Sequence, residues 1–109
     1  MDRDHERLVA ANEALARRVN DAIERGHWPG EEDQGAAYRC ECTRLDCNRL
    51  LELTPAEYER VRAHPRRFVV FPGHERPEVE SVIRAMPAYV VVAKRGEAGA
   101  VAEADDPRD

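Results

Sequence analysis

The feature that most constrains this chain is a group of three cysteines within eight positions. Cys40, Cys42 and Cys47 are all the cysteines that the 109 residues contain, in the spacing Cys-x-Cys-x4-Cys, and His74 follows on a Pro-Gly turn. Three thiolates and one imidazole form a complete tetrahedral ligand set for zinc. A disulfide fits less well, because an odd count leaves one thiol over and Cys40 lies too close to Cys42 for an easy bridge.

The identity of the metal and of its fourth ligand leaves alternatives open. Zinc is the prediction; an iron–sulfur cluster and three buried, reduced thiols without metal are the alternatives. His74 is the predicted fourth ligand, and its rivals are His64, Asp46 or a histidine that only caps the turn. Groups that contact metal-binding thiolates often neutralise their charge or donate hydrogen bonds to them. The candidates for that role flank the cysteines in the sequence: Arg39, Arg44 and Arg49.

Residues 2–25 have the apolar periodicity of an amphipathic helix, and Gly26 is a plausible stop. We expect its charged residues, among them Glu13, Arg17 and Asp21, to face solvent. The apolar stripe would pack against the rest of the chain, a second copy or a protein partner. As a partner-binding surface it comprises Leu8, Leu15, Val19 and Ile23.

Residues 36–94 are predicted to form a small α+β domain with an antiparallel sheet. A hairpin should turn around Cys47, and Thr54-Pro55-Ala56-Glu57 is a capping-box start for one short helix. Strands are expected at 68–71 and 89–93. The stretch 77–86 fits either a helix or a strand, with a slight preference for a β-hairpin. A core of this size is marginal without a staple, which the cysteines would supply.

Composition excludes several classes of protein. The net charge is −5, 36% of residues are charged, and no apolar run has the length of a membrane span. The charged N-terminal sequence lacks the apolar core of a secretory signal, which predicts a cytoplasmic protein. No phosphate-binding glycine loop, nucleophile elbow or deaminase motif is present, which predicts a protein that is not an enzyme.

A run of basic residues offers an alternative function. It would form an electropositive patch for nucleic acid or an acidic partner, although a solvated helix end explains the same pattern. The surplus of arginine over acids is small in this region, and the whole chain is acidic. The patch comprises Arg60, Arg62, Arg66 and Arg67.

Several segments of the chain together resemble a family of small uncharacterised actinobacterial proteins. They are the cysteine motif that begins at Cys40, then Leu-Glu-Leu-Thr-Pro-Ala-Glu-Tyr, Phe-Val-Val-Phe-Pro-Gly-His and Tyr-Val-Val-Val-Ala-Lys. The resemblance implies no activity; it implies that Cys40, Cys42, Cys47 and His74 belong to one motif. The sequence therefore predicts a zinc-stapled regulatory or partner-binding protein. Its parts would be an N-terminal helix (1–26), a linker (27–35), a zinc-binding α+β domain (36–94) and a disordered acidic tail (95–109).

Overall fold

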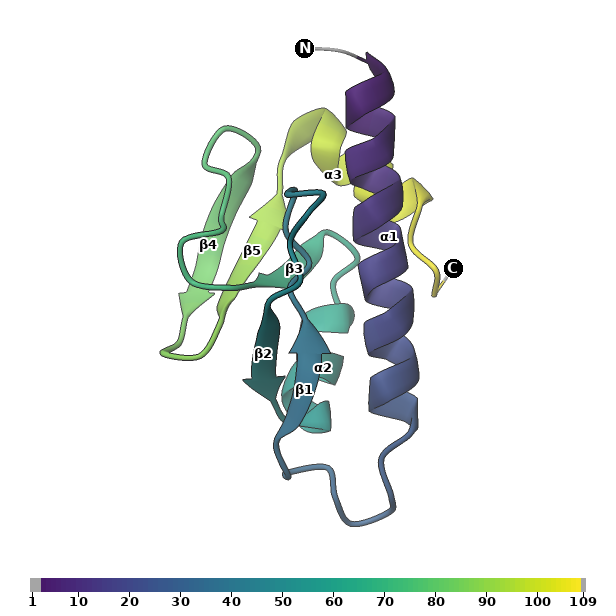
Figure 1. Ribbon diagram of the computed structural model, residues 1–109, viewed down its shortest axis with the longest axis vertical. Helices are drawn as coiled ribbons and strands as arrows, with labels where there is room; N and C mark the ends of the chain where they lie inside the picture. The colour runs from purple at the N-terminus through teal and green to yellow at the C-terminus, as the bar shows by residue number, and fades with distance from the viewer. Residues whose placement is uncertain (1–2, 109) are drawn as a thin grey trace.

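The structure is a computed structural model that describes residues 3–108. Met1, Asp2 and Asp109 lie outside the described residues. The predicted helix start at residue 2 and the predicted end of the tail at residue 109 therefore also lie outside them. The architecture is α+β with antiparallel sheets, as predicted (Figure 1). The elements are α1 (Arg3–Arg25), β1 (Ala36–Arg39), β2 (Leu50–Leu53), α2 (Pro55–Arg62), β3 (Arg67–Val70), β4 (Glu80–Ala85), β5 (Val90–Lys94) and α3 (Gly96–Ala104).

Two antiparallel sheets form the centre of the molecule. The predicted hairpin is confirmed, with β1 paired to β2 so that Tyr38 lies opposite Leu51. The second sheet has the order β3-β5-β4. The ambiguous stretch is therefore strand: β4 pairs with β5, and a bulge between Val82 and Arg84 shifts its register. Tertiary pairing with the apolar β5 decides this, because the periodicity of the segment alone fits both states.

The short helix α2 begins as the sequence predicts. The Thr54 side chain accepts a hydrogen bond from the Glu57 amide at 3.1 Å, and the Glu57 side chain accepts one from the Thr54 amide at 2.9 Å. Pro55 occupies the first helical position, where no amide donor is needed. The inward residues Tyr58 and Val61 are buried, which confirms their predicted orientation.

The long helix α1 buries a different face from the one its apolar periodicity indicates. Leu8 and Leu15 are 59% and 49% exposed, and only Ile23 of the stripe packs against the core cluster. The expectation that Glu13, Arg17 and Asp21 face solvent was therefore wrong. The residues of α1 that are buried are Val9, Glu13, Ala16, Arg17, Asn20 and Asp21.

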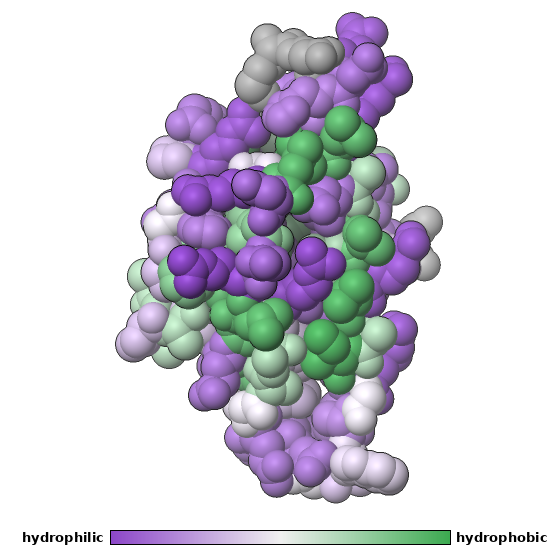
Figure 2. Space-filling view, in the orientation of Figure 1, coloured by the Kyte–Doolittle hydropathy of each residue, from purple (hydrophilic) through white to green (hydrophobic). Residues whose placement is uncertain are grey.

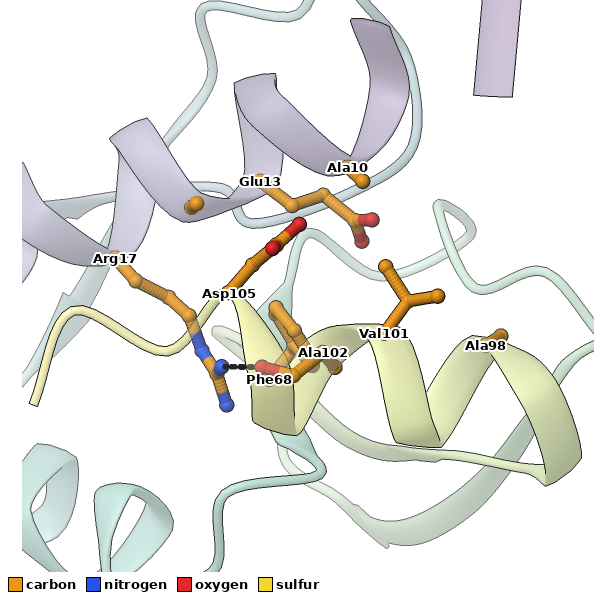
Figure 3. Close-up of a pocket in the computed structure, with 9 residues that line it drawn as sticks. Ala10, Glu13, Arg17, Phe68, Ala98, Val101, Ala102 and Asp105 are labelled. Atoms are coloured by element: carbon orange, nitrogen blue, oxygen red, sulfur yellow. Dashed lines mark hydrogen bonds between the residues drawn. The ribbon is translucent and has the colours of Figure 1, made fainter. Parts of the chain in front are cut away.

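This polar face is stable inside the fold because its groups have partners there. Arg17 donates to the carbonyls of Pro65 and Arg67 at 2.6 and 2.9 Å, and its guanidinium lies 3.7 Å from the centre of the Phe68 ring. It also donates to the carbonyl of Ala102 on α3 (Figure 3). These acceptors offset part of the desolvation penalty of the buried charge, although burial still lowers the pKa of Arg17.

The C-terminal segment corrects a second prediction. Residues 96–104 form α3 instead of a disordered tail, and Ala102 is buried in the core cluster. Beyond the helix, Asp106 accepts hydrogen bonds from Arg62 of α2, and Arg108 donates to Asp21 of α1. The acidic residues that indicated disorder are thus partners for arginines that lie far away in the sequence.

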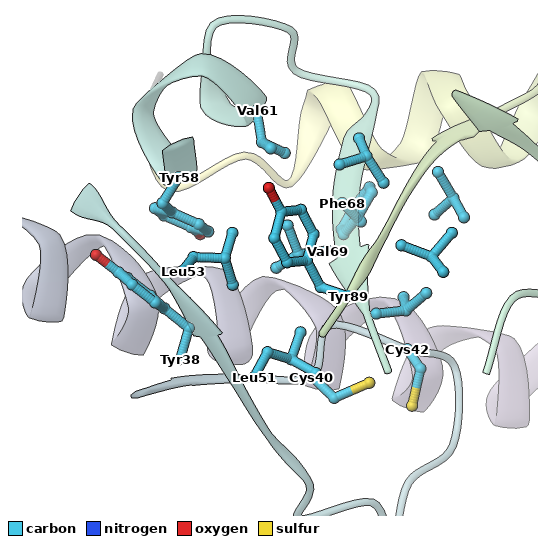
Figure 4. Close-up of a cluster of buried hydrophobic side chains, with 14 of the residues drawn as sticks. Tyr38, Cys40, Cys42, Leu51, Leu53, Tyr58, Val61, Phe68, Val69 and Tyr89 are labelled. Carbon is cyan, nitrogen blue, oxygen red and sulfur yellow. The ribbon is translucent and has the colours of Figure 1, made fainter. Parts of the chain in front are cut away.

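The core lies between the sheets and the helices, and its largest side chains come from both sheets and α2 (Figure 4). The rings of Tyr38 and Tyr58 stack with centroids 4.8 Å apart. Cys40 and Cys42 lie at the edge of the same cluster, where Figure 4 draws their two sulfur atoms close to each other. The cysteine motif is therefore continuous with the core of the domain.

Candidate metal centre

The first two cysteines follow directly after β1. The amide of Cys40 donates to the carbonyl of Arg49 at 3.0 Å, which continues the hairpin beyond the last paired strand residue. The amide of Glu41 donates to the carbonyl of Val69 at 2.8 Å and so anchors the segment to β3. Alternate residues of an extended chain point to the same side, so Cys40 and Cys42 project together and Glu41 projects to the other side.

Two tight turns bring the remaining groups to these sulfurs. A hydrogen bond from the Cys47 amide to the Arg44 carbonyl, 3.2 Å long, closes the turn before β2. A second turn follows β3, where the His74 amide donates to the Phe71 carbonyl at 2.8 Å. Gly73 in this turn has φ +93°, and with the preceding proline it meets the requirements of a type II turn.

The four side chains meet in one compact group. One ligand atom from each of Cys40, Cys42, Cys47 and His74 lies within 4.8 Å of all the others. His74 Nδ1 is 3.7 Å from Cys40 Sγ and 3.6 Å from Cys47 Sγ. Tetrahedral zinc with Zn–S bonds of about 2.3 Å would place its sulfurs roughly 3.8 Å apart. These residues are thus close enough to hold a metal ion.

The group is sheltered, and its thiols are electrostatically unequal. Both Cys40 and Cys42 are buried, and Cys47 and His74 are half-buried. A hydrogen bond from the Cys40 thiol lowers the pKa of Cys42 to about 5, against the opposing effect of burial. The same hydrogen bond, with burial, raises the pKa of Cys40. The Phe71 amide donates to Cys40 Sγ at 3.1 Å, a contact that favours a thiolate at this position once a metal replaces the proton.

His74, and neither of its rivals, joins the cysteines in the part of the chain that the structure describes. His64 lies just after α2 and is exposed, and Asp46 is exposed in the turn before Cys47. The sequence could name His74 as a candidate because of its Pro-Gly turn. Only the pairing of β3 with β5 and of the Cys40 segment with β3 brings that turn to the cysteines.

The three flanking arginines make other contacts. The Arg49 guanidinium lies 4.9 Å from the centre of the Phe71 ring, and that ring is 5.3 Å from the His74 ring. Arg44 contributes its carbonyl to the Cys47 turn, and the Arg39 backbone pairs with the Asn20 side chain. Their predicted role in neutralising the thiolates stays a prediction.

Glu41 is a buried residue beside the candidate site whose supporting role the sequence analysis missed. Its side chain is fully buried and accepts hydrogen bonds from Tyr58 Oη at 2.6 Å, Asn20 Nδ2 at 2.9 Å and the Val69 amide at 3.0 Å. Glu41 lies between two candidate ligands in the sequence, so these contacts link the segment that carries the ligands to α1, α2 and β3. The sequence did contain a signal for the burial of Glu41. In an extended segment, Glu41 points to the side opposite Cys40 and Cys42, and that side faces the interior of the fold.

The predicted basic patch does not form as one surface. Arg62 is buried between Asp21 and Asp106, and Arg66 pairs with Glu103 at 2.6 Å. Arg60 is exposed and Arg67 is half-buried. Inclusion of Arg62 in a surface patch was therefore wrong, because its position on α2 faces α1 and the C-terminal segment.

Comparisons with protein-family models, curated proteins and solved structures find no match to this chain, so the family resemblance stays a prediction. Among the helices of residues 3–108, none combines the length and the apolar character that a membrane crossing requires. The fold and the site together define an α+β protein with a Cys3His group that could bind a metal ion.

Proposed function

We propose that this protein is a small, non-enzymatic zinc protein whose metal is structural and which acts by binding another protein. The observation that carries the proposal is the convergence of four ligand atoms within 4.8 Å. A cytoplasmic location belongs to the same proposal, because thiols stay reduced and free to bind metal in that compartment.

Zinc is favoured over an iron–sulfur cluster by the compactness of the group. A cluster holds its ligands around two or more irons, so that the ligand atoms lie farther apart than around a single ion. The separations of 3.6 and 3.7 Å between His74 Nδ1 and two sulfurs suit one ion. Three thiolates with one imidazole are also a common structural zinc set.

A structural role follows from the completeness of the ligand set. Catalytic zinc sites keep one position open for water or substrate, whereas four protein ligands close the coordination sphere. The ligands come from the segment after β1, the turn before β2 and the turn after β3. A bound ion would therefore join the hairpin to the larger sheet, which is the staple that a core of this size needs.

The exposed stripe of α1 supports the partner-binding part of the proposal. Figure 2 shows hydrophobic surface along α1, next to polar surface on both sides. On this helix Leu8 is 59% exposed and Leu15 is 49% exposed. Such a stripe on a helix fits a protein surface, either of a second copy or of a different chain.

Elemental analysis of protein purified without added metal tests the site. We expect one zinc per chain, and we expect the Cys42→Ser variant to lose the zinc together with the cooperative unfolding of the domain. Structural zinc contributes on the order of 10 kcal/mol in comparable small domains. Iron, no metal, or a Cys42→Ser variant that melts like the wild type would contradict the proposal.

A charge-matched pair of variants tests the stripe. Leu8→Asp with Leu15→Asp should abolish binding yet leave zinc content and melting temperature unchanged, because both side chains are exposed. Arg18→Asp, at an exposed position of the same helix, introduces the same change in net charge and should leave binding intact. Sedimentation detects self-association, and cross-linking from position 15 in the native host detects another protein. A monomer without a cross-linked product would refute this part.

A further inference from the structure

A cavity of about 190 Å³ lies on the face of the β3-β5-β4 sheet beside α2, away from the cysteine group. Its apolar wall includes Ile83, Tyr89 and Val91. Tyr89 and Val91 are nearly fully buried, whereas Ile83 is 45% exposed. The cavity is smaller than those that take drug-sized ligands, so it suits a small group with a short apolar attachment.

Three arginines from three different elements line this cavity: Arg60 of α2, Arg67 of β3 and Arg84 of β4. The sheet register brings the last two together. Arg84 lies opposite Val91, Val91 lies opposite Val69, and Arg67 is on the same face as Val69 because it is two residues away. The convergence is tertiary, since Arg84 belongs to no basic run in the sequence.

None of these three arginines forms an ion pair with a carboxylate of residues 3–108, in contrast to Arg62 and Arg66. The hydrogen bond from Tyr89 lowers the pKa of the Glu57 carboxyl, and Arg60 adds to this effect through its charge alone. The one acid that lines the cavity is Glu57. Its two oxygens are already used, by the Tyr89 hydroxyl at 2.7 Å and by the Thr54 amide at 2.9 Å. The cavity is therefore a locally positive site in a chain whose net charge is −5.

We propose that this cavity binds a phosphate group, held by Arg60, Arg67 and Arg84. A phosphate monoester presents three oxygens and carries a charge of about −1.5 to −2, so it can satisfy several guanidinium groups at once. A carboxylate carries one charge and would leave most of the positive charge unbalanced. The planar fork of arginine suits phosphate oxygens, and Ile83 and Val91 would contact the group to which the phosphate is attached.

Phenyl phosphate is the probe, because it joins a phosphate monoester to a small apolar ring. Titration into the zinc-loaded full chain, followed by calorimetry, should show saturable binding with a dissociation constant of about 1 mM or lower. Arg67→Gln and Arg84→Gln should each weaken binding about tenfold or more. Arg18→Gln, which removes an exposed arginine of α1, should leave binding unchanged.

The melting temperature of each variant is measured, so that a loss of binding is not mistaken for a loss of the fold. No saturable binding up to roughly 10 mM would overturn the proposal. It would also be overturned if the Arg67 and Arg84 variants bound phenyl phosphate as tightly as Arg18→Gln.

The source of the phosphate is decided by competition with a short single-stranded oligonucleotide, with and without a 5′-phosphate. Competition only by the phosphorylated form identifies a terminal phosphate of nucleic acid. Equal competition by both forms, weakened by rising salt and by Arg67→Gln, identifies the phosphodiester backbone. Competition by neither, with phenyl phosphate still bound, identifies a small phosphorylated molecule. All three outcomes support a phosphate site and name its ligand.

Discussion

Replacement of Arg62 by leucine tests whether the polar contacts between α1, α2 and the C-terminal segment stabilise the fold. The Arg62 side chain is inaccessible to solvent. It donates to both oxygens of Asp21 at 3.0 and 3.1 Å, and to Asp106 at 2.5 and 3.1 Å. Burial raises the pKa of Asp106, but the hydrogen bonds from Arg62 and from the Arg108 amide, together with the charges of Arg17 and Arg62, outweigh that effect and the net shift is downward. Arg62 therefore stabilises two partly or fully buried carboxylates.

The expected loss in the free energy of unfolding depends on which arginine partners the two carboxylates retain after the substitution. Removal of one partner from a buried ion pair costs about 3–5 kcal/mol, because the remaining charge is left buried. Arg108 still donates to Asp21 at 3.0 Å, and Arg17 still lies 3.7 Å from Asp106. We therefore expect the lower end of that range, about 3 kcal/mol. For a domain of this size this corresponds to a melting temperature lower by roughly 12 °C or more.

Arg60→Leu is the matched control, because Arg60 is in the same helix, receives the same replacement, is exposed and forms no ion pair with any of residues 3–108. It should change stability by no more than about 0.5 kcal/mol. Urea unfolding of both variants at equal zinc content measures the difference. If Arg62→Leu and Arg60→Leu agree within about 1 kcal/mol, Arg62 behaves as a surface residue and the reasoning fails.

Three further predictions concern other buried groups. His74→Ala should weaken zinc retention against a chelator by at least about 100-fold, whereas His64→Ala should not; equal retention would remove His74 from the site. Glu41→Leu leaves three donors without an acceptor and should lower the free energy of unfolding by roughly 3 kcal/mol, measured in urea; a change under about 1 kcal/mol would refute the role of Glu41. Burial raises the pKa of Glu13 from 4.5 to about 7, although Lys94 opposes it. The folded state then keeps a proton that the unfolded chain releases, so Glu13 should cost up to about 3 kcal/mol of stability as pH rises from 4.5 to 7. Glu13→Gln should remove that part of the pH dependence, and a curve parallel to the wild type would contradict the assignment.

Local signals in the sequence were sufficient for the elements whose stability is local. The capping box at Thr54 and Glu57 forms as predicted, since both hydrogen bonds join residues three positions apart. The hairpin between β1 and β2 was predictable from strand parity and a short turn. The three candidate thiolates were found in the same way, because their spacing brings them together on neighbouring segments.

The face of α1 that packs inward was beyond the reach of periodicity. An apolar stripe predicts burial only where the alternative face has no partners. Here Arg17, Asn20 and Asp21 find acceptors and donors in β1, α2, β3 and the C-terminal segment. Those partners are distant in the sequence, so no window of the chain contains the information. The same reason explains why residues 96–104 form a helix that was predicted to be disordered.

The sequence by itself thus determined the chemistry of the cysteine group, the capped start of α2 and the α+β class. Tertiary structure decided that His74 is the fourth group beside the thiols, that Glu41 supports them from the core, and that Arg84 joins Arg60 and Arg67 around one cavity. The physical reason is the separation along the sequence between the residues that interact. Spacing along a strand or one helical turn is written in neighbouring residues, whereas strand register and the pairing of buried charges depend on segments that meet only in the folded chain.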